Sequence, residues 1–169
     1  MGAEVRPATP QDARAIAEVR VASWRWAYRG LVPDDVLAGM SVAESEAGWR
    51  GILADPAVAV FVASLGDRLV GFASCCASRD ADAPPGTGEI GALYVVEEVA
   101  GTGVGSALMT AAEGKLRSSG HVRATLWVLA SNDRGRGFYE RRGWRWDGST
   151  GTHHVDCAGL PVVRYARPF

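Results

Sequence analysis

The sequence predicts a single α/β domain, 1–169, whose central sheet is mixed and mostly antiparallel, with helices on both faces. Three observations support this prediction. The strand candidates 57–65 and 68–77 are apolar on both sides, a two-residue Gly66-Asp67 loop joins them, and amphipathic helical segments flank them. Strands that are apolar on both sides belong to a sheet that helices cover on each face. A chain of 169 residues is long enough to bury such a core.

One amphipathic helix is expected near the N-terminus, after a short strand at residues 5–8. Thr9 is its expected N-cap, Pro10 follows at a position that tolerates proline, and the helix ends near Tyr28. Its apolar side chains form two rows, of which one can cover the sheet. The other row, which includes Trp24 and Tyr28, either packs on a neighbouring helix or lines a cleft.

The rest of the chain alternates between helices and strands in an order that completes a mixed sheet. Capping residues, turn residues and apolar periodicity predict these elements in turn: helices from residue 33 and from a capping box at 41–44 to residue 53, the two hairpin strands, a loop at 78–88, a strand at 89–95, a helix from 104 to near 120, a strand at 122–129, a helix at 132–142, and strands at 144–147 or somewhat beyond and at 162–166.

The composition excludes several classes of function. The net charge of −1 gives no general attraction to nucleic acid, and no apolar run reaches the ~20 residues of a membrane helix. The N-terminus lacks the apolar core of a signal peptide, and Cys75, Cys76 and Cys157 make a poor disulfide set. No Cys or His spacing suggests a metal site, and His153-His154 is expected to be an ordinary strand or loop pair. We expect a cytoplasmic protein without metal, nucleic-acid or membrane partners.

The most informative segment is the passage from the strand at 89–95 into the next helix. Glycine occupies every second position of the turn between them, at Gly101, Gly103 and Gly105. Glycine has no Cβ to block a close approach. The free N–H groups of such a turn and of the helix start point at one spot, with the positive end of the helix dipole behind them. The turn therefore predicts a cradle for a pyrophosphate group.

A second motif follows after the next strand: Asn132-Asp133-Arg134-Gly135-Arg136-Gly137-Phe138-Tyr139-Glu140-Arg141-Arg142-Gly143-Trp144. With the turn Ala100-Gly101-Thr102-Gly103-Val104-Gly105, it makes the chain resemble the GNAT superfamily of acyl-CoA-dependent N-acetyltransferases along nearly its whole length. A Rossmann domain fits less well, because the triplet is Gly-x-Gly-x-Gly and no acidic ribose partner follows at the expected distance.

The resemblance implies a GNAT-like acetyltransferase fold and the transfer of an acetyl group from acetyl-CoA to a primary amine. The implied reaction is direct transfer within a ternary complex, and no cysteine in either motif suggests a covalent enzyme intermediate. The acceptor would be a small-molecule or peptide amine, and a homodimer is an assembly common in this family. The alternative is a non-catalytic acyl-CoA-binding module that serves as a sensor or a regulator.

The resemblance also implies contacts to the cofactor by position. The main chain of Leu93, Tyr94 and Val95 would pair with the pantetheine arm as an added strand does, and the Val95 N–H would polarise the thioester carbonyl. Asn132 would bond the pantetheine, cap the following helix, or do both. The pyrophosphate would lie on Gly101, Gly103, Val104, Gly105 and Ser106.

Two side chains are implied as catalytic. Tyr139 would protonate the departing CoA sulfur, unless it is a packed residue whose hydroxyl is bonded elsewhere. Glu89 would take the proton of the amine, directly or through water, unless it is a solvated residue at the start of its strand. The alternation of a regular strand would place on one face the side chains of Glu89, Gly91, Leu93 and Val95.

The acceptor site is expected against the first helices and the late hairpin, with Trp24 and Tyr28 as substrate-binding residues. An aromatic wall suits an amine, a ring or an aliphatic chain, so it selects little. The chain departs from the family pattern at Ala100, where Arg or Gln is usual. The backbone cradle needs only the glycines, and Arg134 or Arg136 could supply the missing side-chain cation.

Overall fold

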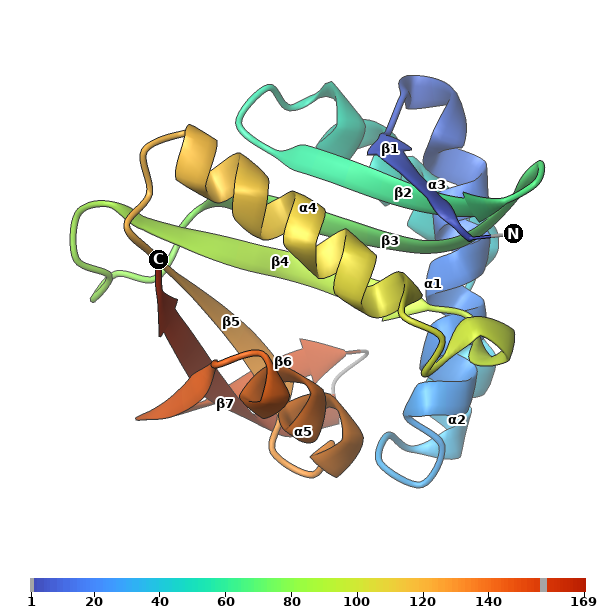
Figure 1. Ribbon diagram of the computed structural model, residues 1–169. Coiled ribbons are helices and arrows are strands. Elements are labelled where there is room, and N and C mark those ends of the chain that lie inside the picture. The colour runs from blue at the N-terminus through green and yellow to red at the C-terminus, as the bar shows by residue number, and fades with distance from the viewer. Residues whose placement is uncertain (1, 156–157) are drawn as a thin grey trace.

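The computed structural model describes residues 2–155 and 158–169, which form one seven-stranded mixed sheet with helices on both faces (Figure 1). The strands lie in the order β1-β2-β3-β4-β5-β7-β6, and every neighbouring pair is antiparallel except β4 and β5. The predicted fold class is confirmed. The strands are β1 Glu4–Pro7, β2 Ala59–Leu65, β3 Arg68–Ala77, β4 Thr87–Val95, β5 Arg123–Leu129, β6 Arg145–Val155 and β7 Ala158–Pro168.

The helices divide between the two faces of the sheet. In Figure 1, α4 crosses the front face and α5 lies below it, whereas α1 and α3 pack together on the opposite face. None of the helices in the described part of the chain is long and apolar enough to cross a membrane. Their bounds are α1 Ala13–Ala27, α2 Asp34–Gly39, α3 Val42–Ala54, α4 Val104–Ser118 and α5 Asp133–Arg141, with short 3₁₀ turns η1 Pro10–Asp12 and η2 Glu97–Val99.

Local capping residues begin the first helices close to the predicted positions. The hydroxyl oxygen of Ser41 accepts a hydrogen bond from the N–H of Glu44 at 3.2 Å, as the capping box predicts for α3. Thr9 donates its N–H to the carboxylate of Asp12 at 2.7 Å. The turn after Thr9 is a 3₁₀ turn, however, and α1 itself begins only at Ala13.

The two apolar rows of α1 enter different clusters. Ile16 and Val19 are buried in the main core, between the sheet and the helices of that face. Trp24 and Tyr28 belong to a second, smaller cluster, where they pack with α2 and with Leu160 of β7. The C-terminal half of α1 therefore lies beside the second half of the sheet.

β4 and β5 separate soon after they meet. They pair only at residues 87–89 of β4 and 123–125 of β5, although β4 continues to Val95 and β5 to Leu129. β5 instead stays paired with β7 along its whole length. The second half of β4 therefore has a strand neighbour only on the side of β3.

β4 contains a bulge at Gly91. Ile90 lies opposite Cys75 of β3 and Ala92 lies opposite Ser74, so Gly91 has no partner. Such an extra residue shifts the alternation of side chains in the strand that carries it. The regular alternation assumed from the sequence therefore does not hold across β4.

The prediction that Glu89, Gly91, Leu93 and Val95 share one face is wrong for this reason. Gly71 of β3 lies opposite Val95. A Cβ added to Gly71 would lie 3.0 Å from the side chain of Val95 and 2.9 Å from that of Leu108 in α4, so Val95 faces α4. Glu89 and Gly91 lie on the other side of the sheet, because the bulge inverts the order. The only sequence signal was a glycine inside a strand, which often marks a bulge.

The C-terminal hairpin is much longer than predicted. The sequence placed these strands at 144–147 or beyond and at 162–166, whereas β6 continues to Val155 and β7 already begins at Ala158. Nearly every residue of β6 is exposed, so its sequence has no apolar alternation to reveal a strand. Cys157, one of the three cysteines, lies outside the described residues, and Cys75 and Cys76 are free thiols.

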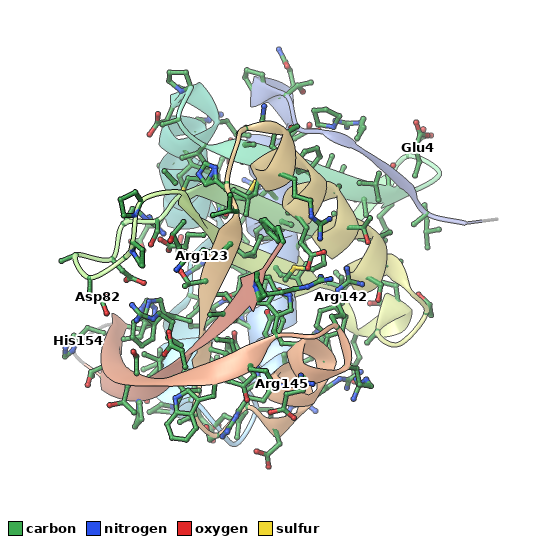
Figure 2. All side chains as sticks on the ribbon, turned by 60° about the vertical axis from the view of Figure 1, so that its left-hand side comes forward. Glu4, Asp82, Arg123, Arg142, Arg145 and His154 are labelled. Atoms are coloured by element: carbon green, nitrogen blue, oxygen red, sulfur yellow. The ribbon has the colours of Figure 1, made fainter. Side chains whose placement is uncertain are left out.

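One arginine ties the loop between β3 and β4 to this hairpin. Arg164 of β7 donates to Asp82 at 2.7 and 2.9 Å, to Asp80 at 3.2 Å and to Asp147 of β6 at 2.6 Å. In Figure 2, Asp82 on the loop and His154 on the hairpin lie on the same side of the molecule. These contacts therefore fix the loop against the C-terminal strands β6 and β7.

A buried carboxylate joins α4 to the C-terminal strands. Glu113 of α4 is 2% exposed and accepts hydrogen bonds from Arg167 at 2.9 Å, Trp144 at 3.0 Å and Arg142 at 3.3 Å. Arg142, at the end of α5, is labelled in Figure 2. Two guanidinium groups and one indole thus converge on this one buried carboxylate.

The variant Glu113→Ala is expected to lower the free energy of unfolding by about 3 kcal/mol, because it strands buried donors without an acceptor. Urea unfolding followed by circular dichroism measures this change. Glu18→Ala is the matched control, since Glu18 pairs with Arg14 on the surface of α1 and both side chains are more than half exposed. Equal destabilisation by the two substitutions would contradict the role of Glu113.

Candidate active site

A cavity of about 730 Å³ occupies the space where β4 and β5 separate. Its walls come from the second half of β4, the turn before α4, helix α5, β5 and the C-terminal half of α1. Val104 is buried and does not line it. All other candidate site residues do: Trp24, Tyr28, Glu89, Leu93, Tyr94, Val95, Gly101, Gly103, Gly105, Ser106, Asn132 and Tyr139.

The main chain of β4 presents a free edge to this cavity. Val96 donates its N–H to the carbonyl of Val70 at 2.9 Å. Hydrogen-bonded pairs alternate along an antiparallel ladder, so Tyr94 is the next residue bonded to β3. The N–H and C=O groups of Leu93 and Val95 therefore point the other way, into the space that β5 has left.

Trp26 of α1 occupies one end of this edge. Its indole N–H donates to the carbonyl of Val95 at 3.0 Å, and the guanidinium of Arg134 from α5 lies 4.7 Å over its ring. The N–H of Val95 and both main-chain groups of Leu93 keep no partner among residues 2–155 and 158–169.

The turn before α4 offers further free amides. Within residues 100–107, only Ala100, Thr102 and Ala107 donate their N–H to a carbonyl of the turn. A Cβ on Gly101 or on Gly103, both with positive φ, would meet no atom within 4 Å, so the space in front of them is open. The amides without an acceptor in the described part of the chain are those of Gly101, Gly103, Val104, Gly105 and Ser106.

These amides converge at the start of a helix of fifteen residues. Orphan N–H groups and the positive end of the helix dipole together form an anion site. The amides without a partner are the same set that the glycine pattern assigned to a pyrophosphate. Their position therefore fits that assignment.

Tyr139 of α5 lines the cavity, and its hydroxyl has no hydrogen-bond partner among the described residues. Its ring packs against Phe138, Trp144 and Tyr165, with centroids 5.4, 6.4 and 6.4 Å away. Burial, together with the phenol of Tyr94, raises the pKa of Tyr139 above its usual value. Tyr139 is therefore protonated at neutral pH and able to donate.

Asn132 caps α5, because its side-chain oxygen accepts the N–H of Gly135 at 3.0 Å, and it also lines the cavity. Of the two arginines considered in place of Ala100, Arg136 is already engaged: it donates to the hydroxyl of Tyr165 and to a main-chain carbonyl. Arg134 lines the cavity and has no carboxylate partner in the described part of the chain. The position of Arg134 is thus the one suited to a phosphate.

Glu89 lines the cavity and is the buried partner of an ion pair with Arg79, with 6% of the Glu89 residue exposed. One carboxylate oxygen accepts from Nη2 of Arg79 at 2.7 Å, and the other accepts from the main-chain N–H and Nε of Arg79 at 3.0 and 3.4 Å. The pair raises the pKa of Arg79. Arg79 belongs to a loop without periodicity, so no sequence pattern pointed to it.

The far end of the cavity, which we call the acceptor end, is aromatic. Tyr28 donates from its hydroxyl to that of Tyr94 at 3.4 Å, and the ring of Trp24 lies 4.8 Å from that of Tyr28. His153 of β6 faces them, and burial and the charge of Arg20 lower its pKa. The aromatic row of α1 thus both packs on α2 and lines a cleft. His153 lies in a strand, as expected for a strand or loop pair, and it also lines the cavity.

No group of three or more His, Cys, Asp or Glu side chains suited to a metal ion occurs within residues 2–155 and 158–169. The groups present fit acetyl-CoA instead. A free strand edge suits the two amides of a pantetheine arm, and a cluster of free N–H groups at a helix start suits a diphosphate. The cavity joins these two features without interruption.

Comparison with known proteins agrees with this geometry. The model of the acetyltransferase (GNAT) family matches residues 19–144, and the match ends before β6 and β7. The uncharacterized N-acetyltransferase YuaI of Bacillus subtilis is 33% identical over 129 residues, which cover 76% of this chain and 72% of that protein.

Solved structures show the same fold at low identity. A PaiA N-acetyltransferase from Thermoplasma acidophilum, solved in complex with coenzyme A, matches with a TM-score of 0.79 at 19% identity over the full length of both chains. A ribosomal-protein-alanine N-acetyltransferase from Brucella melitensis matches with a TM-score of 0.77 at 17% identity, covering 98% of this chain and 99% of the other. Enzymes of the matched family transfer an acetyl group from acetyl-CoA to amine acceptors. The chain belongs to the acetyltransferase (GNAT) family and is an N-acetyltransferase.

Proposed function

We propose that the protein transfers the acetyl group of acetyl-CoA directly to a primary amine, within a ternary complex. The observation that carries the proposal is the row of free main-chain groups that line one cavity, first at Leu93 and Val95 and again in the turn before α4. A thioester held along this row would end beside Tyr139, with the aromatic acceptor end beyond it. The acceptor would be a small molecule or a peptide that presents its amine there.

The main chain would hold and polarise the acyl donor. Acetyl-CoA supplies the acetyl group as a thioester. The N–H of Val95 is free to bond the thioester carbonyl, which would stabilise the negative charge that develops on its oxygen. The amides of Gly101, Gly103 and Gly105 would hold the diphosphate, with Arg134 as a nearby side-chain cation.

Tyr139 would act as the general acid. The C–S bond breaks as the new N–C bond forms, and the hydroxyl of Tyr139 gives its proton to the departing sulfur. The hydroxyl of Tyr139 supports this role, because it is protonated at neutral pH and is not committed to another acceptor among the described residues. An acid of this kind needs position more than acidity, since a thiolate accepts a proton readily.

Glu89 is the only carboxylate that lines the cavity among the described residues, so it remains our candidate acceptor for the proton of the amine. Its two oxygens offer about four lone-pair sites, and Arg79 uses three of them. The remaining site on Oε1 could take the proton, directly or through water. The presence of both an acid and a proton acceptor favours catalysis over a role as a CoA-binding sensor.

Tyr139→Phe is expected to reduce kcat about 10²-fold, the usual contribution of a general acid, with little change in the Kd of CoA. Release of the CoA thiol measures turnover, and calorimetry measures binding. The free energy of unfolding should stay unchanged, because the lost hydroxyl has no hydrogen-bond partner within the described residues. A variant with full kcat would remove Tyr139 from the mechanism.

Gly105→Val is expected to abolish measurable binding of CoA, because its side chain would enter the cavity between the turn and Phe138. Gly105 is helical, so the substitution avoids the strain that the positive φ of Gly103 would add. Gly114→Val, on an open stretch of the same helix outside the cavity, is the matched control for helix stability. Both variants are compared by calorimetry with CoA, and equal affinities would argue that the turn holds no phosphate.

A further inference from the structure

Within residues 2–155 and 158–169, the carboxylates around the acceptor end are committed to arginines. Glu89 is paired with Arg79 through three contacts. Asp80 and Asp82 of the neighbouring loop and Asp147 of β6 are bound by Arg164, and Asp80 also accepts the indole N–H of Trp127 at 3.1 Å. These aspartates do not line the cavity, whereas the ring of Trp127 does. An incoming cation therefore finds no unpaired carboxylate there among the described residues.

Two guanidinium groups beside the same end keep unused donors. Arg79 directs Nε and Nη2 to Glu89, but Nη1 has no partner in the described part of the chain, and 72% of the side chain is exposed. Arg20 of α1 lies 4.8 Å over the ring of Trp24 and makes no hydrogen bond within residues 2–155 and 158–169. An incoming anion would therefore find free N–H groups at this end of the cavity.

The fold holds Arg79 in this place by independent contacts. Its own N–H is bonded to Glu89, and the residue after it, Asp80, is anchored to Arg164 and Trp127. Gly91 lies beside the guanidinium, since a Cβ there would be in ordinary contact with Nη2 of Arg79 at 3.5 Å. The position of Arg79 thus depends on the loop and the hairpin together.

We propose that the amine acceptor carries a carboxylate in addition to its reacting amine, and that Nη1 of Arg79 binds this carboxylate. The inference rests on the proposed acetyl transfer and narrows its acceptor to one charge class. Diamines and polyamines are excluded from this class, because their second ammonium would meet Arg79, with Arg20 behind Trp24, and no unpaired carboxylate among the described residues. In the competing possibility, Arg79 pairs with Glu89 only while the site is empty. A bound substrate ammonium would then take the position of the guanidinium and displace Arg79 from Glu89.

Matched amines that differ only in the group at the far end separate these possibilities. The longer set is δ-aminovalerate, pentylamine and cadaverine, and the shorter set is β-alanine, propylamine and trimethylenediamine. Calorimetry with the CoA-bound enzyme gives the Kd of each compound. In at least one set the carboxylate compound should bind about tenfold more tightly than the uncharged amine, and in both sets the diamine should bind most weakly. A diamine that binds as tightly as the uncharged amine, or the absence of any preference for the carboxylate, would overturn the proposal.

Arg79→Met should reverse this order, because it removes the anion-binding donor and leaves the charge of Glu89 unpaired. Cadaverine should then bind more tightly than δ-aminovalerate. The matched control is Arg50→Met, since Arg50 of α3 is also 70% exposed and paired with a glutamate, but lies outside the cavity. It should keep the original order. An Arg79→Met protein that still prefers the carboxylate compound contradicts the assignment of Arg79.

Glu89→Gln gives a second variant in case Arg79→Met does not fold. It keeps Arg79 and removes the negative charge, so it should tighten the binding of δ-aminovalerate, and unchanged or weaker binding would count against the proposal. Release of the CoA thiol with the same amines tests the proposed function separately. Carboxylate-selective binding without acetylation of any amine would argue against acetyl transfer, whereas acetylation that favours the diamines would argue only against the carboxylate.

Discussion

The site depends on one departure from regular sheet structure, the separation of β4 from β5 after residue 89. A strand inside a sheet normally bonds its main chain on both sides, and an unpaired main-chain group is costly to bury. Here β5 turns toward β7, and the groups of Leu93 and Val95 are left facing a cavity. The sheet thereby provides a ready edge for a ligand with amide groups of its own, without any specialised side chain.

The bulge at Gly91 adds a second consequence. It turns Glu89 away from α4 while Leu93 and Val95 face α4, so the two halves of β4 serve opposite sides of the sheet. The half near the turn offers main-chain groups to the acyl donor, and the half near Glu89 holds the ion pair with Arg79 at the acceptor side. In the proposed function one strand would thus contact both substrates, and the packing of α5 holds Tyr139 at the same cavity.

The sequence was sufficient for the elements whose local chemistry is distinctive. The glycine turn, the capping box of α3 and the Asn132 cap of α5 predicted local structure, and the glycine turn also predicted the free amides at the start of α4. The sequence was not sufficient where tertiary contacts decide the structure. The exposed strand β6 has no apolar alternation, and the bulge changes a strand's orientation by a single residue. Arg79 pairs with Glu89 across an irregular loop, so no periodic pattern around Arg79 could reveal the contact.

The central claim is that coenzyme A binds along the free edge of β4, and main-chain hydrogen exchange measured by NMR with and without CoA tests it most directly. On saturation with CoA, exchange at an amide of this edge, that of Leu93 or of Val95, should slow markedly. The amide of Tyr94 between them should change little, because β3 already occupies it. Unchanged exchange at both Leu93 and Val95 in the saturated protein would contradict the account.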